Sequence, residues 1–294
     1  FYTSQRIPSE EQLTSNYRRI LTNVGKRPTT LRILDAGADK QPPCLHFVHE
    51  DNPVLGDRSI RFLLKNSEIA FSQLRAMMKA MGDTGGQLRI LIPMVAVYEE
   101  VSRIRDHIIK VIRDLRQENY RLKMPKLGAM IEIPSCIPLI PKISSMVDFY
   151  CVGTNDLLQY YIAVDRTNSL VQYLYKWYHP SFLLALKEIA TSCDQVKRDL
   201  SICGEMAGEM WGSLVLMGLG YRNLSMDRQS IYRHHSLVRN SSLRSLERLS
   251  EKLIHQNTGL EVLEQLQLFL DKWDLPYELK NLLQSELNAM INPS

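Results

Sequence analysis

Membrane and export signals are missing from this sequence. No apolar run approaches the roughly 20 residues that a membrane-spanning helix needs. The first residues, FYTSQRIPSEEQ, lack the charged, apolar and small-residue regions of a signal peptide. No low-complexity tract interrupts the 294 residues, of which 45% are hydrophobic and 23% charged. These absences argue against membrane and disordered classes and predict a globular domain.

Paired cysteine motifs and a charge excess are missing as well. The five cysteines make an odd number without any CxxC spacing, which predicts reduced thiols and a cytoplasmic location. The 36 basic and 32 acidic residues leave a net charge of +4, which is too balanced to indicate a nucleic-acid partner. A small anionic substrate remains compatible with this composition.

Short apolar segments recur along the chain, and helical patterns separate them. Strands that are apolar on both faces and alternate with helices predict a parallel sheet with helical cover, so we expect an α/β fold of the (β/α)8 TIM-barrel type. Six strands do not close an eight-stranded barrel, and the chain does not begin with Met, so we expect it to be N-terminally incomplete. The expected strands are residues 31–37, 88–94, 127–133, 149–152, 200–205 and 223–226.

Helix signals complete the outline. Ser9 and Gln12 have the spacing of a capping box and predict a helix that ends at about Gly25. Leu-rich amphipathic patterns after Arg239, interrupted by Pro276, predict a C-terminal helical extension that packs on the barrel or on a second copy of the chain. We expect a first domain over residues 1–239 and the extension over 240–294. Further helices are expected over residues 58–82, 99–119 and 137–143.

The segment DFYCVGTNDLLQYYIAVDRTN, residues 148–168, carries the strongest functional signal. Asn155 and Asp156 stand where a strand passes into a helix, which is where α/β proteins place their chemistry. Helix N-terminal amides bind anions, a carboxylate can hold a divalent cation, and the guanidinium of Arg166 can fork onto phosphate. Together these groups indicate phosphoryl chemistry.

A second carboxylate stands at the end of another expected strand. Glu132 closes LGAMIEI, so in a parallel barrel Glu132 and Asp156 point from the same rim and could share one cation. Magnesium commonly takes one or two protein carboxylates and fills its octahedral shell with water and substrate phosphate. Either residue alone is about as often a helix cap or a salt-bridge partner.

The motif GTNDLLQYYIAVDRTN closely resembles the signature of the phosphoenolpyruvate-utilising enzymes, in particular the Enzyme I branch, the phosphoenolpyruvate-protein phosphotransferases. MIEIP, ICGEMAG and DNPVLGDRSIR resemble further motifs of that family. The resemblance covers about residues 8–238 and implies a barrel whose first two βα units, with one more phosphate-binding arginine, are absent here. It also implies a homodimer.

The resemblance assigns roles residue by residue. Glu132 and Asp156 match the Mg²⁺ ligands, Arg58 and Arg166 the phosphate-binding arginines, and Asn155 a further substrate-binding position. Cys203 matches the general acid that protonates the enolate of pyruvate, although a cysteine ending an apolar strand is more often a core residue. The phosphoryl acceptor is a histidine on a separate domain, which passes the group to a phosphocarrier protein. This segment alone is therefore expected to bind substrate without completing the transfer.

Two residues depart from the family's pattern, and two other functions are compatible with the sequence. Ala38 replaces a usual glycine, where it could hinder the backbone, and Asp57 replaces a usual aromatic residue, where it could pair with Arg58 or another basic group. The pyruvate phosphate dikinase or phosphoenolpyruvate synthase branch shares GTND and CGE, but QYYIAVDRTN favours Enzyme I, for which the nitrogen-regulatory form is our weak preference. A phosphoenolpyruvate sensor without turnover is the alternative of another class.

Overall fold

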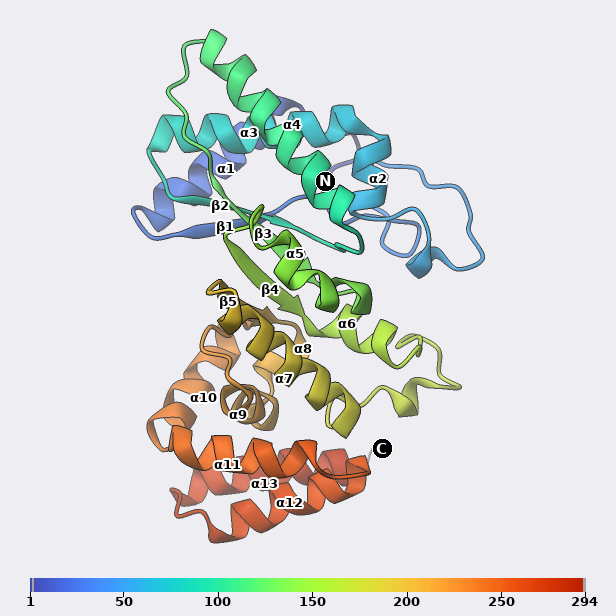
Figure 1. Cartoon of the computed structure of the whole chain (residues 1–294), viewed down its shortest axis with the longest axis vertical. Coiled ribbons are helices and arrows are strands. Elements are labelled where there is room, and N and C mark those ends of the chain that lie inside the picture. The colour runs from blue at the N-terminus through green and yellow to red at the C-terminus, as the bar shows by residue number, and fades with distance from the viewer. Residues whose placement is uncertain (2, 293–294) are drawn as a thin grey trace. The chain divides into compact units, whose positions relative to one another are not determined.

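The structure, a computed structural model, describes residues 1 and 3–292 (Figure 1). It consists of two compact units, each of which is described by itself. Unit 1 comprises residues 1–131 and 142–149, and unit 2 comprises residues 132–141 and 150–294. Within the described part of the chain, no helix is both long enough and apolar enough to cross a membrane.

Unit 1 is built on parallel strands that follow the chain order. β1 (Thr29–Arg32) pairs with β2 (Leu88–Ile92), and β2 pairs with β3 (Lys126–Ile131), both in parallel. Almost all of β2 and β3 is buried, as expected for strands covered on both faces. Parallel neighbours joined through helices confirm the predicted strand-helix alternation.

The helices of unit 1 start and stop where the sequence provides caps and breakers. The predicted capping box is present at α1 (Glu10–Val24), where Ser9 Oγ accepts from the Gln12 N–H at 3.2 Å and Gly25 ends the helix. α1 packs against α3, and α3 packs against α4. Besides the short η1 turn (Pro53–Leu55), the remaining helices are α2 (Ile60–Lys65), α3 (Ser67–Thr84) and α4 (Tyr98–Gln117).

Two expectations for unit 1 need correction. The strand expected over residues 31–37 is shorter and earlier, because the Leu34 N–H donates to Gln73 Oε1 at 2.9 Å and leaves the sheet ladder. The single helix expected from Arg58 is two helices, because the backbone at Asn66 is not helical and its side-chain amide donates to the Phe62 carbonyl.

Unit 2 continues the alternation. β4 (Phe149–Gly153), whose first residue belongs to unit 1, leads into α6 (Thr154–Tyr161), and β5 (Asp199–Cys203) is its neighbour in the sheet. The sixth expected strand is reduced to a parallel bridge between Ile202 and Leu224. The remaining short elements are η2 (Pro134–Leu139), α5 (Ile140–Ile143, of which the last two residues belong to unit 1), η3 (Gln172–Leu174) and α8 (Glu205–Gly208).

The C-terminal helices pack within unit 2. α11 (Leu243–Ile254) lies on α7 (Pro180–Gln195) and on α9 (Met210–Leu219), and α13 (Tyr277–Ile291) lies on α9 and on α12 (Gly259–Lys272). α10 (Arg228–Arg239) also contacts α9. α9 is buried almost throughout, because helices cover it on several sides.

Candidate functional site

The GTND and ICGE motifs are held together at the ends of two neighbouring strands of unit 2. Thr154 Oγ1 donates to the carbonyl oxygen of Cys203 at 2.9 Å. Asn155 and Glu205 bond reciprocally: Asn155 Nδ2 donates to Glu205 Oε1 at 3.2 Å, and the Glu205 N–H donates to Asn155 Oδ1 at 2.9 Å. The first turn of α6 is thereby tied to the residues that follow β5.

Gly204 makes this junction possible. Its φ of +102° lies in a region that L side chains rarely adopt. A Cβ at this position would also lie 2.1 Å from Thr154 Oγ1 and 2.8 Å from Asn155 Oδ1. The glycine between Cys203 and Glu205 therefore meets both a backbone requirement and a space requirement.

Tyr175 connects the asparagine to the arginine. Its hydroxyl donates to the Asn155 carbonyl oxygen at 2.9 Å. Burial raises the pKa of Tyr175 to about 12, against the opposing effect of the charge and hydrogen bond of Arg166. The Arg166 N–H itself donates to Gln159 Oε1 at 3.1 Å. Two predicted site residues, Asn155 and Arg166, therefore both interact with Tyr175.

Sequence reasoning missed Tyr175 as a site residue and gave Glu205 no role. Tyr175 lies after Arg166 in an irregular segment without a periodic pattern, so no local signal marked it. Glu205 stands inside the ICGE motif, so its position there could have marked it as a site residue. Both now connect predicted residues: Tyr175 contacts Asn155 and Arg166, and Glu205 bonds to Asn155.

Glu132 and Asp156 each lie shortly after a strand, β3 and β4 respectively. Glu132 follows β3 directly and is 1% exposed, and Asp156 is half-buried in the first turn of α6. Among the described residues, no three His, Cys, Asp or Glu side chains form a ready-made metal site. Two carboxylates fit the donor set of a Mg²⁺ ion that takes its other ligands from water and substrate.

Cys203 is the last residue of β5 and is half-buried, so its thiol is not sealed in the core. Its Sγ lies 3.8 Å from the Sγ of Cys151, which stands on β4 and is 7% exposed. Cys193, by contrast, is buried in α7, and burial raises the pKa of its thiol to about 12.

Arg58 belongs to unit 1 and is 2% exposed. Its guanidinium pairs with Asp35 at 3.2 Å and with Asp39 at 3.1 Å. Burial would raise the pKa of Asp35, but the charges of Arg58, Arg32 and Lys40 outweigh it and hold that pKa below its usual value. Gly37 allows the close approach, since a Cβ there would lie 2.4 Å from the Cβ of Arg58.

The two departures from the family pattern have ordinary structural outcomes. Ala38 does not have a positive φ, so the backbone there requires no glycine. The Asp57 carboxylate pairs with Lys65 at 3.1 Å. Of the two predicted kinds of partner, it therefore contacts a basic group other than Arg58. Neither residue introduces backbone strain into the segment before Arg58.

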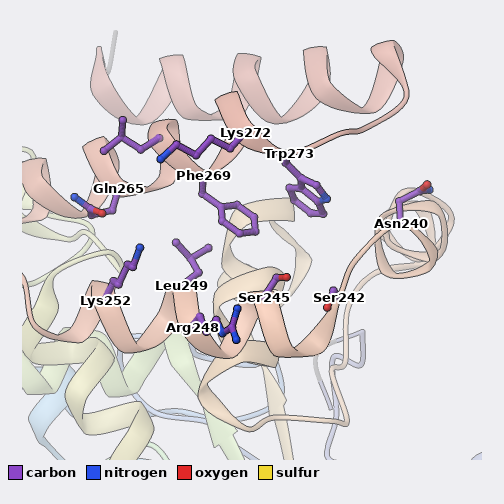
Figure 2. Close-up of a pocket in the computed structure, with 11 residues that line it drawn as sticks. Asn240, Ser242, Ser245, Arg248, Leu249, Lys252, Gln265, Phe269, Lys272 and Trp273 are labelled. Atoms are coloured by element: carbon purple, nitrogen blue, oxygen red, sulfur yellow. The ribbon is translucent and has the colours of Figure 1, made fainter.

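Unit 2 contains a cavity at the Asn155–Glu205 pair and a second one away from it. The first has a volume of about 360 Å³ and is lined by Asn155, Tyr175 and Glu205 among others. The second, of about 560 Å³, lies between α11 and α12 and contains none of the predicted site residues (Figure 2). Its lining includes Leu249 and Phe269 together with the exposed cations Arg248, Lys252 and Lys272.

Residues 1–243 match the family described as "PEP-utilising enzyme, PEP-binding domain". The chain is 40% identical over 273 residues to a protein of Escherichia coli named "Phosphoenolpyruvate-dependent phosphotransferase system", with 92% of this chain and 36% of that protein covered. Proteins named "Phosphoenolpyruvate-protein phosphotransferase" are 32% identical in Borreliella burgdorferi and 34% identical in Listeria monocytogenes. These alignments cover 92% and 90% of this chain and 47% and 46% of those proteins. The chain therefore spans less than half the length of these curated relatives.

Proposed function

This chain belongs to the PEP-utilising enzymes, in which it matches the PEP-binding domain, and on that basis we propose that it is the phosphoenolpyruvate-binding catalytic part of a phosphoenolpyruvate-protein phosphotransferase. The observation that carries the proposal is the hydrogen-bonded junction of GTND and ICGE, which brings Asn155 and Cys203 to the ends of neighbouring strands. The reaction transfers the phosphoryl group to a histidine nitrogen and releases pyruvate.

Substrate binding is assigned to polar groups that the fold already holds in place. The Arg166 guanidinium binds phosphate oxygens by paired N–H donors and offsets their charge as the P–O bond breaks. Asn155, fixed by Glu205 and Tyr175, presents its amide at the start of α6. Arg58 is proposed as a further phosphate-binding arginine, for which phosphate would replace a carboxylate of Asp35 or Asp39.

The proton step is assigned to Cys203. When the histidine nitrogen attacks phosphorus and the P–O bond breaks, the electron pair stays with enolpyruvate. The Cys203 thiol gives its proton to the methylene carbon of enolpyruvate, which becomes the methyl group of pyruvate, and the thiolate recovers a proton from water. Half-burial at the end of β5 is compatible with this role, because the thiol can meet a substrate.

A Mg²⁺ ion held by Glu132 and Asp156 would neutralise charge on the substrate oxygens. The buried carboxylate of Glu132 and the half-buried carboxylate of Asp156 supply the two protein ligands that such an ion commonly uses.

The partners follow from the same proposal. The phosphoryl group goes to a histidine domain of the same protein and from there to a phosphocarrier protein, whereas nucleic acid and membrane have no role. The five reduced cysteines support a cytoplasmic location. We also propose a homodimer, and sedimentation that shows only monomer at high micromolar concentration would contradict it.

The relatives favour this function over the alternatives. They are phosphotransferases or components of a phosphotransferase system, not dikinases or synthases. A sensor without turnover would have no need for a half-buried cysteine beside the substrate-binding asparagine. Residues 1–239 are proposed as the substrate-binding part and residues 240–294 as its helical extension.

Calorimetric titration of this chain with phosphoenolpyruvate, with and without Mg²⁺, tests the proposal. We expect binding that depends on Mg²⁺ and that weakens at least about tenfold, or about 1.4 kcal/mol, in Asp156→Ala and Glu132→Ala. Glu264→Ala, which removes an exposed carboxylate of α12, is the control and should bind as wild type does. Equal affinity in both conditions would contradict the metal assignment. Failure to bind phosphoenolpyruvate under either condition would contradict the proposed function.

A further inference from the structure

Two thiols face each other across neighbouring strands of unit 2. Cys151 on β4 and Cys203 at the end of β5 have their sulfur atoms 3.8 Å apart, and the Cys151 S–H donates toward Cys203 Sγ. Cys203 is half-exposed, whereas Cys151 is 7% exposed. The proposed catalytic reaction uses only Cys203, so it leaves the nearness of the second thiol unexplained.

We propose that Cys151 and Cys203 form a reversible oxidation site that closes to an intramolecular disulfide. A disulfide needs sulfur atoms about 2.05 Å apart and Cα atoms about 4.4–6.8 Å apart. Neighbouring strands lie about 4.8 Å apart, which falls inside this Cα range. Rotation of the two side chains is therefore the movement that we expect to close the 3.8 Å gap between the sulfur atoms.

The oxidant is a hydroperoxide such as hydrogen peroxide. The half-exposed Cys203 sulfur attacks the peroxide O–O bond, which gives a sulfenic acid and one molecule of water. The Cys151 sulfur then attacks the Cys203 sulfur, the S–O bond breaks, and the hydroxyl leaves with the Cys151 proton as a second molecule of water. Two thiols lose two electrons in total, and the peroxide takes them up.

The other three cysteines are either buried or belong to unit 1. Cys193 is buried, and its raised pKa, about 12, leaves little of the reactive thiolate. Cys136 is buried too. Cys44 is half-exposed, but it belongs to unit 1 and its thiol contacts the Phe1 carbonyl oxygen at 3.6 Å.

The consequence for activity rests on the proposed function. The disulfide removes the S–H bond of Cys203, so the proposed proton donor is lost while Asn155 and Arg166 keep their own hydrogen bonds. Oxidation would therefore stop turnover and reduction would restore it, which couples phosphoryl flow to the redox state of the cell.

Peptide mass spectrometry tests the oxidation site directly, because each of the five cysteines lies on a different tryptic peptide. The chain is treated with hydrogen peroxide, its remaining thiols are alkylated, and it is digested without reductant. We expect a crosslink between residues 143–166 and 199–222 that dithiothreitol removes, and Cys44→Ser should form the same crosslink. Consumption of the Cys203 thiol without this crosslink, or crosslinks that mainly join other cysteines, would overturn the proposal.

A Cys151→Ser variant tests whether Cys151 is the thiol that closes the disulfide. Without the resolving thiol, Cys203 should advance to the sulfinic acid, which dithiothreitol does not reverse. Full reversibility of Cys203 oxidation in this variant would contradict a role for Cys151.

Activity is measured separately, as pyruvate release by a protein that also carries the part of the relatives that this chain does not cover. Loss of at least tenfold on oxidation, recovered with dithiothreitol, is expected. A crosslink that forms while pyruvate release continues would keep the oxidation site and reject the catalytic role of Cys203.

Discussion

At the scale of single residues, the site depends on a few positions whose neighbours come from other segments. Gly204 carries a positive φ and leaves room for Thr154 and Asn155, and Tyr175 holds the Asn155 carbonyl oxygen. The sequence proposed Asn155, Arg166 and Cys203 as site residues because they stand in recognisable motifs. It could not identify Tyr175, because a hydroxyl donating to a backbone carbonyl leaves no pattern in the chain.

Gly204→Ala should disrupt the site. The left-handed backbone costs an alanine about 1–3 kcal/mol, and its Cβ would collide with Thr154 Oγ1. We expect lower stability in urea and phosphoenolpyruvate binding weakened at least about tenfold, or about 1.4 kcal/mol. Gly85→Ala is the control, since Gly85 also has a positive φ but no neighbouring atom within 4 Å of the added Cβ. That variant should lose about 1 kcal/mol of stability and retain binding; equal behaviour of the two variants would refute the steric argument.

Cys203→Ser should separate chemistry from binding. Serine keeps the size of the side chain, but its hydroxyl is a far weaker acid than a thiol, so proton delivery to enolpyruvate should slow by at least about 100-fold. Phosphoenolpyruvate affinity should stay near wild type, because the residues proposed to hold its phosphate and carboxylate groups are unchanged.

The measurement combines calorimetry with hydrogen exchange from the methyl group of pyruvate in deuterated water. The exchange is followed in a protein that also carries the part of the relatives that this chain does not cover. Exchange at the wild-type rate in Cys203→Ser would show that this cysteine is a core residue and that the acid lies elsewhere.

At the scale of elements, α13 anchors the start of α9. The Glu286 carboxylate accepts from the N–H groups of Met210 at 3.1 Å and Trp211 at 2.8 Å, which are donors that a helix N-terminus leaves without helical partners. Trp211 Nε1 adds a hydrogen bond to the Leu283 carbonyl oxygen at 3.0 Å. The sequence predicted that the C-terminal helices pack either on the barrel or on a second copy of the chain. These hydrogen bonds place α13 on α9 within unit 2.

Glu286→Ala should therefore destabilise unit 2. Removing a charged acceptor from two half-buried N–H groups costs about 1.5–3 kcal/mol, and Glu286→Gln should lose less because its amide oxygen still accepts. Urea unfolding followed by fluorescence measures the change. Glu264→Ala, on an exposed face of α12, should stay within about 0.5 kcal/mol of wild type. If both alanine variants unfold alike, Glu286 does not anchor the helix.

At the scale of the whole molecule, buried tyrosines make stability sensitive to alkali. Burial raises the pKa of Tyr221 well above its usual value, and burial raises the pKa of Tyr150 as well. The folded chain keeps these phenols protonated where the unfolded chain ionises them, at about pH 10. The stabilising effect is complete below that pH and falls as pH rises, by about 1.4 kcal/mol per pH unit for each proton.

Tyr221→Phe tests this slope. Above about pH 10, the free energy of unfolding of wild type should fall more steeply with pH than that of the variant, by the contribution of one proton. The variant also loses the hydrogen bond from Tyr221 to the Leu186 carbonyl oxygen. This loss lowers the free energy of unfolding by the same amount at every pH, so it does not contribute to the difference in slope. Tyr232→Phe removes an exposed hydroxyl and should follow the wild-type slope. Identical slopes in all three proteins would contradict the prediction.

Local sequence patterns are sufficient to predict part of this structure. Apolar runs followed by helical periodicity predicted the parallel α/β order, the capping box predicted the start of α1, and the motifs indicated the family and the residues proposed for its site. These features are set by neighbours within one or two turns of the chain, so they are visible without a fold.

Tertiary structure decided the contacts between distant segments. The pairing of Cys151 with Cys203, the reciprocal bonds of Asn155 and Glu205, and the cap that Glu286 gives α9 join residues 50 to 76 positions apart. The local sequence around one residue of each pair does not identify the other residue. Which strands are neighbours and where helices dock depend on how apolar faces across the whole unit are buried together.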